Sequence, residues 1–297
     1  MPPADPQNDR QLLEDQIRAA CILEATARKA GNVHPLRSFS DLTYDDFVGS
    51  ANVVAPILAR TAESGVGLAV RDAVAATQKR VGRNTNLGIM LLLAPLAAMP
   101  HGVRLVDGIE AVLAGLTRRD AELVYEAIRL ANPGGLGRVS EQDIAEQPTQ
   151  SLRDVMALAA DRDLIARQYV ENFSLVLDFG LPYLARTTDF AQHWEPAIVG
   201  LQLEIMALHA DSLIVRKCGR EVADEASQRA RAVLAAAQPG TRQAQESLIE
   251  FDLWLRADGN KRNPGTTADL IAASLFAAFR DGGIPTRVIP QPLGPLL

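Results

Sequence analysis

The chain has 297 residues, of which 47% are hydrophobic and only 5% aromatic, and its formal net charge at pH 7 is -6. The acidic balance and the lack of any Lys/Arg cluster argue against a nucleic acid polymer or an anionic membrane as partner. Helix-forming Ala, Leu, Arg, Glu and Gln recur throughout, whereas bounded runs of β-branched and aromatic residues are scarce. We therefore expect an all-α protein.

No segment has the pattern of an export signal or a membrane span. The first residues lack the basic start and apolar stretch of a signal peptide. The most apolar run, Leu87 to Met99, is too short for a membrane helix and contains Pro95. Cys21 and Cys218 form no CxxC motif, which suits a reducing compartment. These features predict a cytoplasmic protein without membrane contact.

The domain organisation predicted from the pattern is simple. Residues 1–9 read as a flexible arm, residues 10–283 as a single-domain multi-helix bundle, and residues 284–297 as an extended tail with several prolines. The run from Leu87 to Met99 is apolar on every face, so we expect it to be the buried central helix. In chain order, the expected helices cover 10–29, 43–58, 67–81, 87–99, 106–114, 118–130, 151–178, 193–217, 221–236, 241–257 and 270–279.

Capping signals mark some of these helices. Thr43 with Asp46, and Thr266 with Asp269, have the spacing of capping boxes. Gly31, before the helix-disfavouring Pro35, suits a helix C-terminus. These positions predict where the first helix ends and where the second and the last begin.

Polar loops stand directly before predicted helices. Asn84-Thr85-Asn86 precedes Gly88 and the apolar helix, and residues 263–267 precede the last helix. The glycine-rich loop 134–137 is a third place where backbone could approach a ligand closely. A helix start offers free amides and partial positive charge, which suits phosphate groups. Polar helix caps are also routine in proteins, so each loop alone is a weak signal.

Carboxylates are predicted on otherwise apolar helix faces. Glu24 follows the stripe that contains Ile17. In the expected helix 193–217, Glu204 and Asp211 share a face with Leu208 and Val215. A buried carboxylate is costly unless it is paired or metal-bound. Each residue is therefore either a locally satisfied acid or part of a site. Common catalytic motifs are absent, and no metal-spaced pair occurs among His34, His101, His193 and His209.

Taken in chain order, the sequence motifs resemble those of the triphosphoribosyl-dephospho-CoA synthase family over about residues 20–282. Glu24 followed by 29–33 is similar to the family's Glu…Lys-Pro-Gly-Leu-Val. Residues 82–88 are similar to Gly-Thr-Asn-Thr-His-Lys-Gly, and 263–270 to Ser-Pro-Gly-Gly-Ser-Ala-Asp-Leu. The family's Asp-Met and Asp-Thr-Asn motifs have counterparts at Asp41-Leu42 and Asp211-Ser212.

The chain also departs from the family pattern. Phe39 stands where the family has a histidine, Asn86-Leu87 replaces His-Lys, and Leu213 replaces an asparagine. Arg216-Lys217 replaces His-Arg. The glycines, asparagines and acids of the motifs remain. The resemblance therefore indicates a divergent branch.

The resemblance implies a transferase that joins ATP to 3′-dephospho-CoA and releases adenine, with ATP as substrate, dephospho-CoA or a similar nucleotide as acceptor and Mg²⁺ as the expected cation. The implied catalytic residues are Asp211, Asp41 and Glu24, and the implied Mg²⁺ ligands are Asp211 and Asp269. The implied nucleotide contacts are Lys29, Gly31, Asn32, Asn84, Thr85, Asn86, Gly88, Arg216, Pro264, Gly265, Thr266 and Asp269.

Other interpretations stay open. The chain could be a related nucleotide transferase or hydrolase in another cofactor pathway, such as a one-carbon carrier route. It could instead be a catalytically silent helical protein that keeps the pocket for ligand or partner binding. A homo-oligomer is compatible with either. The sequence does not separate a general base from a metal ligand among the candidate acids.

Overall fold

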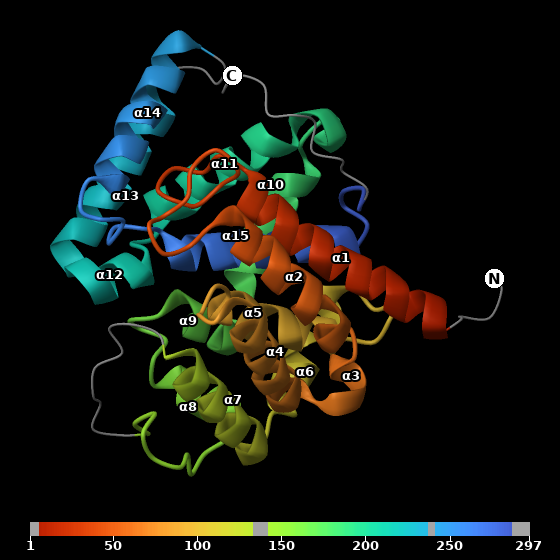
Figure 1. Ribbon diagram of the computed structural model, residues 1–297. Helices are drawn as coiled ribbons and strands as arrows, with labels where there is room; N and C mark the ends of the chain where they lie inside the picture. The colour runs from red at the N-terminus through yellow and green to blue at the C-terminus, as the bar shows by residue number, and fades with distance from the viewer. Residues whose placement is uncertain (1–5, 133–141, 237–240, 287–297) are drawn as a thin grey trace.

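The computed structural model describes residues 6–132, 142–236 and 241–286, and these residues form helices and no β-strand (Figure 1). The predicted all-α, single-domain fold is confirmed. The first helix begins at Pro6, so residues 6–9 are helical and not part of a loose arm. The predictions for residues 1–5, the loop 134–137 and residues 287–297 lie outside the described residues.

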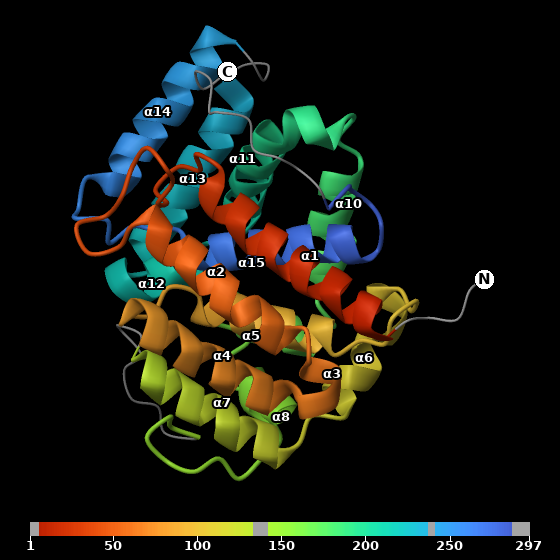
Figure 2. The same cartoon turned by 45° about the vertical axis from the view of Figure 1, so that its right-hand side comes forward.

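The N-terminal half of the fold is a stack of helices. Figure 2 shows α1, α2, α4 and α7 one below another, and each packs against the next. The capping box predicted at Thr43 and Asp46 is present at the start of α2, and Thr117 and Asp120 form another at α7. The helices of this half are α1 (Pro6–Thr26), α2 (Tyr44–Leu58), α3 (Thr61–Ser64), α4 (Val66–Val81), α5 (Leu87–Ala97), α6 (Leu105–Ala114) and α7 (Arg118–Ala131).

The middle of the chain is more broken than its pattern predicts. The single helix expected over 151–178 is wrong: Asp163 caps a new helix, and Asn172 and Phe173 take positive φ angles of 49° and 60°. The observed elements are α8 (Leu152–Ala157), α9 (Leu164–Val170), the π-helix η1 (Leu175–Gly180) and α10 (Leu181–Ala185). The helical spacing of apolar residues continues across these breaks, because each short helix buries one of its faces.

The helix expected over 193–217 is also wrong. It consists of α11 (Phe190–Leu208) and α12 (Ser212–Cys218), which meet at an angle of 60°. Asp211 lies at the break and accepts hydrogen bonds from the first amides of α12, so it begins a helix and is not inside one. Its predicted face with Leu208 and Val215 therefore does not exist.

The C-terminal helices are α13 (Arg220–Ala236), α14 (Arg242–Arg256) and α15 (Gly265–Arg280). The capping box predicted at Thr266 and Asp269 is wrong, because α15 starts at Gly265 and its Ncap residue is Pro264, which provides no side-chain cap. The Thr266 hydroxyl instead accepts a hydrogen bond from Ser212. The first helix likewise ends at Thr26, ahead of the predicted end near Lys29.

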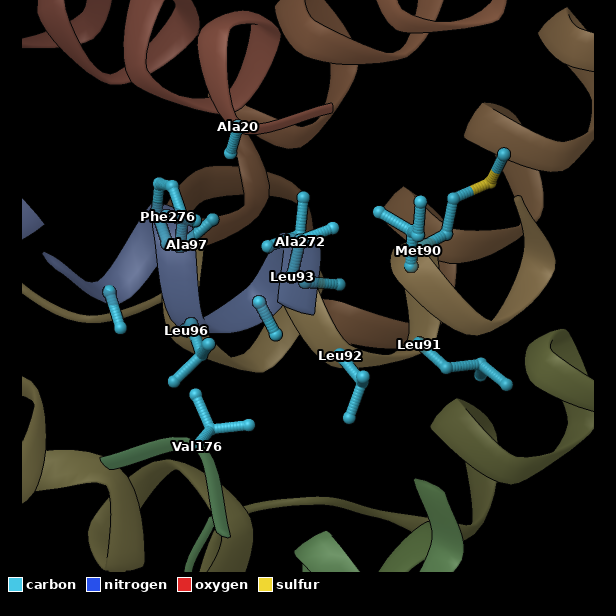
Figure 3. Close-up of a cluster of buried hydrophobic side chains, with 14 of the residues drawn as sticks. Ala20, Met90, Leu91, Leu92, Leu93, Leu96, Ala97, Val176, Ala272 and Phe276 are labelled. Carbon is cyan, nitrogen blue, oxygen red and sulfur yellow. The ribbon is translucent and has the colours of Figure 1, made fainter. Parts of the chain in front are cut away.

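The core is built around α5, as predicted. Every residue of α5 from Gly88 to Ala97 is buried. Figure 3 shows Leu92, Leu93 and Leu96 among side chains of α1, η1 and α15. A second, smaller apolar cluster joins α11 to α14 at one corner of the molecule (upper left in Figure 1). The fold thus has one large core and one satellite cluster.

No single helix of the described residues is long and apolar enough to cross a membrane. The bent pair α11 and α12 reaches that length and composition only when the two are taken together.

The central position of α5 predicts that its leucines carry a large share of the stability. Leu93 is fully buried, so Leu93→Ala should lower the free energy of unfolding by about 2–5 kcal/mol through lost burial and the cavity that remains. Urea unfolding followed by circular dichroism measures this. The matched control is Leu253→Ala on α14, whose side chain is 52% exposed and which should change stability by less than about 0.5 kcal/mol. Equal effects for the two leucines would contradict the assignment of α5 as the core.

Candidate functional site

A cavity of about 940 Å³ opens where the helices of the upper and lower parts of Figure 1 meet. Its upper wall consists of the loop after α1, α12, and residues 259–265 leading into α15. Its lower wall consists of the end of α4, the start of α5, and parts of α7, α8 and α9. The volume is at the upper end of the range for small-molecule pockets, so the cavity can hold ligands of nucleotide size.

Most of the residues proposed from the sequence meet in this cavity, although they come from distant parts of the chain. Those on its wall are Glu24, Asn32, Asp41, Asn84, Thr85, Asn86, Gly88, Arg216, Gly265, Thr266 and Asp269. The N-termini of α5 and α15 bring the two polar loops together, because α5 and α15 pack side by side. The remaining candidates lie behind the wall.

Lys29 is the first candidate that lies behind the wall. Its side chain is fully buried and does not line the cavity, so its expected contact with a nucleotide is wrong. Its ammonium lies 2.9 Å from Glu24 Oε1 and also donates to the Glu24 carbonyl oxygen. An unpaired charge at this depth would be costly. Lys29 therefore compensates the buried charge of Glu24, which does reach the cavity.

Gly31 and Pro264 form a contact between two loops behind the wall, and neither lines the cavity as expected. Gly31 has a φ of +75°, and a side chain there would place its Cβ 2.9 Å from Pro264 Cδ. The neighbouring Asn32 does line the cavity, but its amide group is engaged. It donates to Asn263 Oδ1 over 2.7 Å and accepts from Gln202 Nε2 over 3.1 Å. These contacts fix the upper wall.

Asp211 is the most important correction, because we expected it to bind Mg²⁺ or act as a base. It is buried and does not line the cavity. Its Oδ1 accepts from the amides of Leu213 and Ile214 over 2.9 and 3.1 Å. Its Oδ2 accepts from the amide and hydroxyl of Thr267 over 2.7 and 2.8 Å. Burial raises the pKa of Asp211 while these bonds oppose the rise. The carboxylate ties α12 to α15 and has no free oxygen for a substrate.

Asp269 differs from Asp211 in having no hydrogen bond or ion pair within the described part of the chain. It lies in the second turn of α15 on the cavity wall, against the N-terminus of α5. Only a glycine at position 88 allows this approach, since a Cβ there would overlap Asp269 Oδ2. Gly88 thus shapes the site by leaving space for a carboxylate.

The electrostatic environment of Asp269 favours proton uptake. Desolvation raises its pKa well above the ordinary aspartate value, and the negative charge of Glu24 adds to the rise. The charges of Asp211 and Asp163 act in the same direction, and Arg216 opposes them. A carboxylate with a raised pKa in a cavity is typical of a catalytic acid or base.

The cavity wall also carries positive charge, part of which, such as Arg162, the sequence did not single out. Arg162 and Arg216 line it, together with the N-termini of α5 and α15, neither of which has a side-chain cap from its Ncap residue, Asn86 or Pro264. Arg216 lies 3.8 Å from Asp163, and its Nε is buried without a hydrogen-bond partner among the described residues. The other cations on the wall are Arg83, Lys217 and Lys261. Such an arrangement suits a polyphosphate.

Two of these cavity residues, Arg162 and Asp163, were not identified from the sequence. Asp163 stands before a helix and had a capping signal, but the region was predicted as helix interior. Arg162 lies in the same segment and had no signal at all. No group of three or more His, Cys, Asp or Glu side chains that could hold a metal ion occurs in residues 6–132, 142–236 and 241–286. The pair of Mg²⁺ ligands expected at Asp211 and Asp269 is therefore wrong, since the Asp211 oxygens are already occupied.

The geometry of Asp211 predicts a structural role. In Asp211→Asn, one of the two oxygens becomes an NH₂ group that faces donors, so we expect a loss of about 2–4 kcal/mol in the free energy of unfolding. Denaturant unfolding measures this loss. ATP binding, measured by calorimetry well below the unfolding midpoint, should change less than threefold. Normal stability of Asp211→Asn combined with lost ATP binding would instead show that Asp211 belongs to the ligand site.

Known proteins of similar sequence and fold point to one family. The family model described as ATP:dephospho-CoA triphosphoribosyl transferase matches residues 10–287. A crystal structure from Archaeoglobus fulgidus, assigned as a triphosphoribosyl-dephospho-CoA synthase, is similar with a TM-score of 0.62 and 29% sequence identity. The match covers 78% of this chain and 98% of that one. No curated protein matches the chain significantly. The chain belongs to the ATP:dephospho-CoA triphosphoribosyl transferase family.

Proposed function

We propose that the cavity catalyses the family's reaction and that Asp269 is its general base. A ribose hydroxyl of 3′-dephospho-CoA attacks C1′ of the ATP ribose, so that a C–O bond forms and the bond from C1′ to adenine breaks. The hydroxyl proton passes to Asp269, and adenine leaves with the electron pair of the broken bond and takes up a proton from water. The triphosphate stays on the transferred ribose. The observation that carries this proposal is the unpaired Asp269 carboxylate on the wall of a cavity rich in cations.

The raised pKa of Asp269 suits this role. A base is most effective when its pKa is near the working pH, because it is then both deprotonated and strong enough to take a proton. Glu24 cannot serve equally well, since its carboxylate is already paired with Lys29. Its negative charge beside Asp269 can stabilise the positive charge that develops on the ribose as adenine departs.

The triphosphate needs positive partners that do not move during the reaction. The N-terminal amides of α5 and α15 offer fixed partial charges, and Arg216 offers a guanidinium on the same wall. Thr85 and Thr266 also line the cavity close to these helix starts. We assign this end of the cavity to ATP.

Mg²⁺ fits the site only as part of the substrate complex. The described residues offer no cluster of three acidic or histidine ligands, but Mg²⁺ is commonly held by substrate phosphates with one or two carboxylates. Asp41 is an exposed carboxylate on the cavity wall and would provide such a ligand. The ion would neutralise part of the triphosphate charge. We also infer a cytoplasmic location, because both cysteines are free thiols and ATP is the substrate.

Two alternative functions lead to different results in one experiment. A nucleotide hydrolase or a transferase with another acceptor would release ADP, pyrophosphate or a different product. A silent binding protein would release nothing. Mass spectrometry of a reaction with ATP, Mg²⁺ and dephospho-CoA separates them from our proposal, which requires free adenine and an acceptor carrying a triphosphoribosyl group. The unpaired Asp269 favours the enzyme, since a pure binding site for polyphosphate gains nothing from a buried negative charge.

Replacing Asp269 tests the proposed base. Asp269→Asn removes the proton acceptor but nearly preserves size, so we expect kcat for adenine release to fall by a factor of about 10² or more. The melting temperature and the affinity for ATP should be close to those of the parent. Asp178→Asn, at an exposed aspartate away from the cavity, is the control and should retain full activity. Turnover of Asp269→Asn at the parent rate would exclude Asp269 as the base.

The pH dependence gives a second test. A general base works as the carboxylate, so kcat/KM should fall as pH is lowered through the folded-state pKa of Asp269. Desolvation and the nearby Glu24 charge raise this pKa, so the loss should begin well above the range of an ordinary aspartate, about pH 4. The rate of adenine release from about pH 4 to about pH 9 measures it. ATP affinity measured at the same pH values is the control for substrate titration. A rate that is flat down to about pH 4 would contradict the raised pKa.

A further inference from the structure

The lower wall of the cavity differs in chemistry from the upper wall. Along α7 and α8 it is mainly apolar, whereas Glu24, Asp269 and the N-terminus of α15 lie on the upper wall, and the N-terminus of α5 belongs to a separate part of the lower wall. The apolar side chains on this wall are Val124, Ile128, Leu130, Val155, Met156 and Leu158. ATP carries no aliphatic group that would match this surface.

Leu130 and Leu158 mark the open edge of this apolar wall. Each is 42% exposed although it lines the cavity, so each has apolar surface available to a ligand. Val124 is buried, and Ile128 packs partly against the core, so the wall is held in place from behind. A ligand lying along it would remove the leucines from water without disturbing the fold.

Arg162 lies between the apolar wall and the polar end. It is exposed on the cavity rim, and its guanidinium is anchored by a 3.3 Å hydrogen bond to the Leu158 carbonyl. The next residue, Asp163, faces Arg216 at 3.8 Å. A cation thus stands where an apolar surface meets the cavity's charged region.

We propose that the apolar wall along α7 and α8, formed by Val124, Ile128, Leu130, Val155, Met156 and Leu158, binds the pantetheine arm of the acceptor and that Arg162 binds the acceptor's diphosphate. This inference rests on the proposed function. It places ATP at the helix N-termini and the acceptor along α7 and α8. An acceptor of this kind has a nucleoside, a diphosphate and a long arm in that order, and the arm carries methyl and methylene groups between its amides. The site has reactive carboxylate, cation and apolar wall in the same order.

Binding measurements test the arm separately from the nucleotide. ADP is dephospho-CoA without pantetheine, so calorimetry of both ligands reports the arm's contribution to Kd. The parent should bind dephospho-CoA at least tenfold more tightly than ADP. Leu158→Asn should weaken dephospho-CoA binding by roughly five- to tenfold, the effect of losing one partly buried leucine contact, and leave ADP binding unchanged. Arg162→Gln should weaken both ligands alike.

The matched control is Leu253→Asn, at a leucine of similar exposure outside the cavity, which should bind both ligands like the parent. Equal affinities of the parent for ADP and dephospho-CoA would overturn the proposal, as would a Leu158→Asn variant that weakens both ligands equally or neither. The outcome does not depend on turnover. Absence of adenine release together with a selective effect of Leu158→Asn would reject the proposed reaction and keep the acceptor site.

Discussion

The burial of α5 is the constraint on which the rest of the structure depends. Because this helix is apolar on every face, it has to be surrounded by other helices, and its N-terminus then lies inside the protein. The unbonded amides of a buried helix start need polar partners or a solvated space. The cavity provides that space, and the polar residues 84–86 line it. The same helix that forms the core therefore also creates a polar site in its middle.

The acidic residues around the cavity divide into those that build it and those left free to react. Asp211 gives all its hydrogen-bonding capacity to α12 and α15, and Glu24 is paired with Lys29. Asp269 stays unpaired because Gly88 lets it lie directly against α5. The charge of Asp211 is satisfied by amides and that of Glu24 by a lysine. Only the charge of Asp269 stays uncompensated among these three acids, so the unfavourable charge is concentrated at one place. That place is where proton transfer is proposed.

Much of the fold and the polar loops of the cavity wall could be predicted from the sequence, since both follow from local patterns. A run that is apolar on every face marked α5, and polar loops before helices marked residues 84–86 and 263–267. The errors came from tertiary contacts. Asp211 fits a helix interior by spacing, but its oxygens accept from Thr267 on a distant helix, which no local pattern reveals. Lys29 was predicted to bind phosphate, but the fold buries its ammonium against Glu24. Arg162 became a site residue only because α8 and α9 bring it to the cavity.

The residues at which the chain departs from the family motifs lie on the cavity wall. Phe39, Leu87 and Leu213, which replace polar residues of the family pattern, all line the cavity. The residues that hold the proposed reaction centre, Glu24, Gly88 and Asp269, match that pattern. Change has thus affected the surroundings of the substrates and has spared the carboxylates and the glycine that accommodates one of them. Apolar replacements on a wall contact weaken hydrogen bonding to a ligand without removing the base, so they alter which substrate fits more than which bond is made.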